Sequence, residues 1–241
     1  SAPKLLIDQA SGGRWALFGT GRYLVPDDKT TLAPQAYYGI REPTNSSGFT
    51  LGTVDTSDIE EVGDIETFPD SSIRSSDGTA VIIDTDVIET FGELISVLRS
   101  KGGWRIDFAV PAGKSAERNF TDTFLFGNVA LFTTFQPDGA ACDADGTGRL
   151  YGLHAFTGVA PPFSPLGTEN NAFLQTVATK TIELGDGIPA APEVFRTDTG
   201  KPMVMVQTST GDMISTQLSD APVPTGRQSW REIPVDDSLF D

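Results

Sequence analysis

Two aspartates stand where a calcium-binding loop could begin. The segment CDADGTG places Asp143 and Asp145 in the Asp-x-Asp-Gly order that opens such a loop. An EF-hand loop would continue with an oxygen ligand at its fifth position and a bidentate glutamate at its twelfth. Counted from Asp143, those positions hold Thr147 and His154, so the pattern breaks. The sequence favours an acidic β-turn here and leaves Asp143 and Asp145 as weak candidates for a metal site.

The rest of the chain does not support catalysis by a nucleophile. His154 is the only histidine, and no Gly-x-Ser-x-Gly turn exists to present a serine to it. One histidine cannot form a multi-histidine zinc site. The Gly-Thr-Gly run at residues 19–21 could bind phosphate if a helix followed, but Pro26 argues against that helix. We therefore predict no catalytic and no cofactor-binding residue, a strand position for His154, and a strand-ending turn at 19–21.

An acidic stretch, DIEEVGDIETFPD, offers many carboxylates in no clear order. A glycosidase needs two carboxylates at a defined separation, and no pair stands out. The sequence predicts a solvated acidic insertion over residues 50–101. The second half of this insertion has apolar residues spaced for one helical face, at Val87, Ile88, Phe91, Leu94, Ile95 and Leu98. This spacing predicts a helix over 86–99, capped by Thr85 or Asp86 and ended by Gly102.

Composition narrows the classes of function. The chain has 241 residues, of which 38% are hydrophobic, enough for one substantial core. The net charge of −16 repels phosphate backbones and anionic bilayers, so we expect no nucleic-acid partner. No apolar run reaches the length of a membrane span. Cys142 is the only cysteine and cannot form a disulfide within the chain.

Strand-prone runs repeat along the chain, and these strands would have to position any functional site. Each of three sets holds three strand-prone runs separated by Gly, Asp or Asn turns, and the middle run of each set is the most apolar. The runs are SAPKLLID, RWALFGTG and QAYYGIRE, then RNFTDTFLFG, NVALFTTFQP and GRLYGLHAF, then PAAPEVFRTD, KPMVMVQTS and DMISTQLS. Small antiparallel sheets of this kind bury both faces when they stack radially, which predicts an all-β fold of β-propeller type.

Two details refine this prediction. Leu131 and Phe132 lie in the middle run of the second set and should be buried between blades. The run GWRIDFA alternates apolar Trp104, Ile106 and Phe108 with polar residues, as an outer strand would. The tryptophans could stack a sugar or a quinone, but we interpret them as blade packing: they are Trp15, Trp104 and Trp230.

The number of sets suggests an incomplete ring. Three sets plus a last run, QSWREIP, are fewer than the four to eight blades that propellers use. We expect residues 1–241 to form the C-terminal part of one propeller domain, completed by an upstream segment. Without that segment, the chain should aggregate or bind a hydrophobic dye.

Six motifs in order resemble the C-terminal propeller of the PilY1 family, the type IV pilus biogenesis and tip-adhesin proteins. The motifs are WALFGTGRYL with YYGIREP, GWRIDF, AERNFTDTFLFGNVALFTTFQP with the following Cys142, GRLYGLHAFTG and GRQSWREI. The order matches over nearly the whole chain. Two departures are Ala116 in place of the family's glycine before Glu117-Arg118, and the added carboxylates of CDADGTG.

The resemblance implies a quinoprotein-like propeller whose C-terminal blades this chain supplies. The family's calcium loop lies upstream of the 19–21 turn, so its ligands cannot be transferred to this sequence, and we expect no cofactor in this segment. The implied function is non-enzymatic support of pilus assembly and adhesion. The implied partners are minor pilins and host or surface ligands, and the implied location is the cell surface, the pilus tip or the periplasm of a bacterium.

Two alternatives remain open. Quinoprotein dehydrogenases resemble this kind of propeller, but they often place a disulfide of adjacent cysteines beside the quinone, which a single cysteine cannot supply. A bound quinone chromophore would identify such an enzyme. A sugar-binding propeller module is the other alternative, and tryptophan-dependent glycan binding would identify it.

Overall fold

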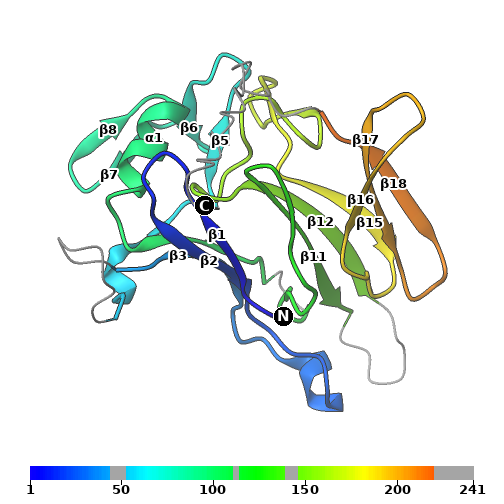
Figure 1. Ribbon diagram of the computed structural model, residues 1–241. Helices are drawn as coiled ribbons and strands as arrows, with labels where there is room; N and C mark the ends of the chain where they lie inside the picture. Colours follow the sequence, from blue (N-terminus) through cyan, green and yellow to red (C-terminus); the bar gives the residue numbers. More distant parts are fainter. Residues whose placement is uncertain (44–52, 111–113, 139–145, 220–241) are drawn as a thin grey trace, which may run out of the picture.

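The computed structural model describes residues 1–43, 53–110, 114–138 and 146–219, and its three larger sheets stand side by side (Figure 1). The first sheet has the order β1-β2-β3-β9-β4. Its strands are β1 (Lys4–Ile7), β2 (Arg14–Gly19), β3 (Ala36–Arg41), β9 (Gly103–Asp107) and β4 (Ile59–Glu61). The first four strands are antiparallel, and β4 runs parallel to β9.

The second sheet has the order β10-β11-β12-β15, and the third has the order β16-β17-β18. The second comprises β10 (Phe124–Phe126), β11 (Val129–Pro137), β12 (Gly146–His154) and β15 (Thr181–Asp186). The third comprises β16 (Glu193–Arg196), β17 (Pro202–Gln207) and β18 (Met213–Gln217). All nine strands expected from the repeated runs are therefore confirmed.

The sheets pack face to face around two clusters of buried side chains. The first cluster joins the inner face of the first sheet to one face of the second, where the ring of Tyr37 stacks on Phe132 at 3.7 Å. The second cluster joins Leu131 and Leu150 of the second sheet to Val204 and Val206 of the third. Leu131 and Phe132 are both completely buried, as expected for a strand between two blades. The predicted all-β, propeller-like stacking is thus confirmed.

The strand β9 corrects one expectation. Its apolar residues Trp104 and Ile106 face the core, and Phe108 directly after the strand is also buried, as the alternating pattern predicts. However, β9 is not an outer strand, because β4 pairs with its free side. Little in the pattern of residues indicates this pairing, since β4 has only three residues and comes from the acidic stretch.

The predicted solvated insertion is wrong for much of its length. The stretch after β4 forms two hairpins, β5 (Ile65–Thr67) with β6 (Ile73–Ser75) and β7 (Val81–Ile83) with β8 (Asp86–Ile88). Val62, Ile65 and Ile73 belong to the first core cluster. Apolar residues spaced between the carboxylates therefore anchor this segment to the core.

The helix in the insertion exists but begins later than predicted. The helix α1 spans Phe91–Leu98, and residues 86–88 are the strand β8 instead. Thr90 is the true N-cap, because its hydroxyl accepts the backbone N–H of Glu93 while the Glu93 carboxylate accepts the N–H of Thr90. This capping box is a stronger start signal than the apolar spacing that suggested an earlier start. The helix ends at Leu98 and not at Gly102.

The remaining described elements are short. They are the 3-10 helices η1 (Pro26–Thr30) and η2 (Thr56–Asp58) and the hairpin of β13 (Thr168–Asn170) with β14 (Thr176–Ala178). Within the described ranges, no helix is both long and apolar enough to span a membrane.

Candidate functional site

A closed loop between β2 and β3 holds a dense network of polar contacts. Its base is tied by two hydrogen bonds, from the Thr20 N–H to the Ala36 carbonyl and from the Ala36 N–H to the Thr20 hydroxyl, both 2.8 Å long. We call residues 21–35 the anchored loop; it carries η1 and projects from the sheets (Figure 1). An open pocket of about 390 Å³ is lined by Gly21, Arg22, Asp28, Thr31 and Gln35 of this loop and by Arg118.

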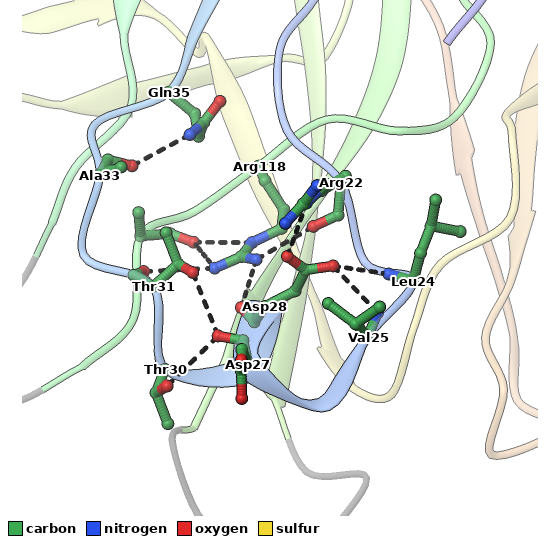
Figure 2. Close-up of polar contacts among 11 residues, drawn as sticks. Arg22, Leu24, Val25, Asp27, Asp28, Thr30, Thr31, Ala33, Gln35 and Arg118 are labelled. Carbon is green, nitrogen blue, oxygen red and sulfur yellow. Dashed lines mark hydrogen bonds and ion pairs between the residues drawn. The ribbon is translucent and has the colours of Figure 1, made fainter.

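The side chain of Arg118 fills the centre of the anchored loop (Figure 2). This residue is only 2% exposed, and its guanidinium donates to four backbone carbonyls. The acceptors are Ala116 O (3.1 Å from Nε and 3.0 Å from Nη2), Arg22 O (3.1 Å), Asp28 O (2.5 Å) and Thr31 O (3.5 Å). Burial lowers the pKa of Arg118, and the negative charge of Asp28 opposes that shift. Three of these carbonyls, those of Arg22, Asp28 and Thr31, belong to the anchored loop, so Arg118 serves as its internal scaffold.

Glycine is required where the loop meets this side chain. Gly21 has a φ of +123°, and a Cβ at this position would lie 2.4 Å from the Cβ of Arg118. The 19–21 run therefore ends a strand and admits Arg118, as the predicted turn requires, and no α-helix follows it. The packing of Gly21 against Arg118 gives a physical reason for a glycine at this position.

Asp28 fixes the other side of the loop. Its carboxylate accepts the backbone N–H groups of Leu24 (2.8 Å) and Val25 (3.0 Å) and the Nε–H of Arg22 (2.8 Å). These hydrogen bonds, that from Leu24 first, lower the pKa of Asp28 to about 2. The carboxylate is therefore ionised at neutral pH and holds the chain between Arg22 and Asp28 in one conformation.

The anchored loop presents three aliphatic side chains to solvent, although its interior is polar. Leu24 is 86% exposed, Leu32 62% and Val25 46%. The side chain of Arg22 is also exposed beside them. A rigid loop that presents aliphatic side chains to solvent is suited to binding another molecule.

Glu117 precedes Arg118 and is buried in the opposite direction, against the second sheet. Its carboxylate accepts hydrogen bonds from Thr134 (2.5 Å), Arg149 (2.6 Å) and Tyr151 (2.9 Å). Burial, together with the charge of Glu117, raises the pKa of Tyr151. Adjacent buried charges thus link two sheets: Arg118 binds the loop of the first sheet, and Glu117 binds strands of the second.

The structure places His154 in the core at the end of β12. Its ring lies edge-on to Phe91 and Phe156, with centroid distances of 5.3 and 5.5 Å. Burial lowers its pKa to about 4, and the positive charge of Arg99 adds to this shift. His154 is therefore a neutral strand histidine with a packing role, as predicted.

The other candidates divide between buried and undescribed positions. Trp15 and Trp104 are 1% and 0% exposed, and the Trp104 indole N–H donates to Ala155 O at 3.1 Å, so both have the packing role predicted for them. Asp143, Asp145, Cys142 and Trp230 lie outside the described residues. Within the described part of the chain, no group of three or more histidine, cysteine, aspartate or glutamate residues is placed to hold a metal ion.

Sequence reasoning missed the anchored loop. Glu117 and Arg118 stand out in the sequence only as part of a motif that resembles the PilY1 family, and no pattern marks Asp28. The role of Arg118 depends on contacts with residues about 90 positions away, such as that with Asp28 O. The best local signal was the glycine pair at 19 and 21, which indicates a close approach by another segment.

These features define a class: an all-β, propeller-like domain with face-packed sheets and a rigid surface loop. Comparison with known proteins adds a particular similarity. The chain is 28% identical over 174 residues to the type IV pilus biogenesis factor PilY1 of Pseudomonas aeruginosa (strain UCBPP-PA14). It is 26% identical over 161 residues to a PilY1 homolog of Xylella fastidiosa (strain Temecula1 / ATCC 700964). No family model matches the chain.

A solved structure shares the fold. The crystal structure of the Pseudomonas aeruginosa PilY1 C-terminal domain superposes with a TM-score of 0.59 and 20% identity over 93% of this chain. The matches cover 68% and 66% of this chain but only 15% and 11% of the two relatives. The chain likewise spans 45% of the solved domain. The resemblance to the PilY1 C-terminal domain expected from the motifs is confirmed in both sequence and fold.

Proposed function

We propose that this chain is the C-terminal propeller-like part of a factor for type IV pilus biogenesis. The observation that carries this proposal is the joint similarity in sequence and fold to the PilY1 C-terminal domain. The factor acts at the bacterial cell surface or in the periplasm, where it contacts pilus components such as minor pilins and supports adhesion to host or other surfaces.

We further propose that the chain acts by binding and not by catalysis, and that it holds no cofactor of its own. Two buried ionisable groups support this. The Glu117 carboxylate is engaged by three donors, and the His154 ring is enclosed by aromatic rings. Neither group is free to exchange a proton with a substrate.

The test uses the source bacterium and the whole protein. A strain lacking the gene is complemented either with the full-length protein or with the protein lacking these 241 residues. We expect surface pili and surface attachment to return only with the full-length protein, at equal protein levels on immunoblots. Normal piliation with the shortened protein would refute the proposal.

A separate measurement tests the non-enzymatic part. The absorption spectrum of the purified full-length protein should show only aromatic side-chain bands. A bound quinone chromophore would instead support a quinoprotein dehydrogenase.

A further inference from the structure

We infer that the anchored loop, residues 21–35, is the surface through which this domain docks onto a protein subunit of the pilus machinery. The subunit must offer an apolar recess for Leu24, Val25 and Leu32, with a carboxylate at its edge for Arg22. This inference rests on the proposed function, and it adds the part of the molecule that makes the contact.

Exposure of the loop is the first observation. Leu24 and Leu32 are 86% and 62% exposed, and Val25 is 46% exposed. Leu24 and Leu32 gain little from folding, because most of their surface stays in water, and Val25 still leaves nearly half of its surface exposed. Their burial on binding would supply the free energy that folding leaves unused.

The rigid support beneath these side chains is the second observation. Three carbonyls of the loop are held by Arg118, and the backbone N–H groups of Leu24 and Val25 are held by Asp28. The Thr30 and Thr31 hydroxyls both donate to Asp27 O, at 3.2 and 3.1 Å. A loop already fixed in one conformation loses little conformational entropy on binding, so more of the burial energy appears as affinity.

Charge favours a protein recess over a lipid surface. The chain carries a net charge of −16, which opposes approach to anionic lipids. On the loop itself, the exposed Asp27 lies close in sequence to Arg22 and the three aliphatic residues. A mixed set of one cation, one anion and aliphatic side chains matches the core and polar rim of a protein interface.

The chain offers a matched control. Leu174, at the turn between β13 and β14, is 84% exposed, nearly the same as Leu24. Its φ of +59° is a conformation that aspartate tolerates better than leucine, so Leu174→Asp should fold normally. Leu24→Asp and Leu174→Asp therefore make the same chemical change at two equally exposed positions.

The experiment measures binding of the full-length protein to the purified soluble domains of the pilin-like subunits of the same bacterium. Leu24→Asp should weaken binding by about tenfold or more, since one buried leucine accounts for at least that factor. Leu174→Asp should leave binding unchanged. Arg118→Lys, which keeps the charge but loses the forked hydrogen bonds, should also weaken binding although every contact side chain remains.

The outcomes separate this inference from the proposed function. If Leu24→Asp binds and supports piliation as the wild type does, while loss of all 241 residues abolishes pili, the inference is wrong and the proposed function stands. If loss of the 241 residues leaves piliation intact, the proposed function is wrong, and the inference that rests on it is wrong as well. Binding to phosphatidylcholine vesicles that Leu24→Asp abolishes, with no subunit binding, would overturn the inference in favour of a lipid surface.

Discussion

The two faces of the first sheet carry similar side chains in different surroundings. On the inner face, Trp15 and Tyr37 are at most 1% exposed because they pack against the second sheet. On the outer face, Leu5 and Ile7 are 75% and 57% exposed. A groove of about 560 Å³ runs over this edge of the sheet, lined by Leu5, Leu6, Ile7, Arg14, Trp15, Ala16, Ile40 and Glu42.

This difference shows that the sheet is built for two neighbours. An antiparallel sheet with one solvated face usually alternates apolar residues with polar ones. Here the outer face also presents a stacked aromatic pair, Phe18 and Tyr38, with ring centroids 5.4 Å apart. The second sheet has a neighbour on each face, as the two core clusters show. The outer face of the first sheet is therefore suited to contact a further sheet, as the predicted upstream blade would provide.

The largest expected effect is in the core between the first and second sheets. Phe132→Ala removes a completely buried ring from between Tyr37 and Tyr151 and should lower the free energy of unfolding by about 3–5 kcal/mol. Phe173→Ala, at a position 54% exposed, is the control and should change stability little. Chemical denaturation measures both. Equal effects of the two variants would mean that the inner face is not the main core.

A smaller effect on stability, at His154, depends on pH. The pKa of His154 falls from an unfolded value of 6.5 to about 4 in the fold, so the folded state binds a proton less readily than the unfolded state. The free energy of unfolding is therefore highest above pH 6.5, where His154 is neutral in both states. It falls by up to about 3 kcal/mol as the pH falls toward 4. Denaturation midpoints at pH 7 and pH 4.5 should therefore differ less in His154→Gln than in the wild type. An unchanged pH dependence in the variant would assign the acid sensitivity to other groups.

The anchored loop gives a local effect. Arg118→Lys should make trypsin cleavage after Arg22 or Lys29 faster by about tenfold or more, because the lysine cannot hold the three loop carbonyls that Arg118 holds and the loop opens more often. The control Arg105→Lys changes a partly exposed arginine on β9 and should leave the cleavage pattern of the loop unaltered. Resistance of the Arg118 variant at both sites would show that the loop is stable without its scaffold.

The contrast between faces also explains what could be predicted from the sequence. The run VALFTTF predicts its strand because burial on both faces leaves a continuous apolar run. The run PMVMVQT also predicts its strand, although its buried residues alternate with half-buried methionines. The start of α1 was missed because Val87 and Ile88 belong to a hairpin whose spacing imitates a helical face. The anchored loop could not be predicted for a different reason. Arg118 binds backbone carbonyls, and every residue type has the same backbone carbonyl, so no residue pattern marks these contacts.

The outer face provides a test with almost no effect on stability. Leu5→Lys with Ile7→Thr changes two exposed residues, so the melting temperature of the 241-residue chain should stay nearly constant. Binding of a hydrophobic dye to this chain should fall clearly, since the face that attracts the dye has become polar. A wild-type chain that is a monodisperse monomer without dye binding would contradict the predicted exposure of a blade-facing surface.

The smallest expected effect concerns calcium. Chelation should leave the melting temperature of the 241-residue chain unchanged, because a calcium ion needs six to eight oxygen ligands and CDADGTG supplies few. The structure adds a reason from described residues. A twelve-residue loop counted from Asp143 would have to include Gly146–His154, but these residues form β12, which pairs with β11 along its whole length. Its last position, His154, is buried against Phe91 and Phe156 and faces no ion. A marked fall in melting temperature on chelation that disappears in Asp143→Ala would show that the two aspartates bind calcium with ligands from elsewhere in the chain.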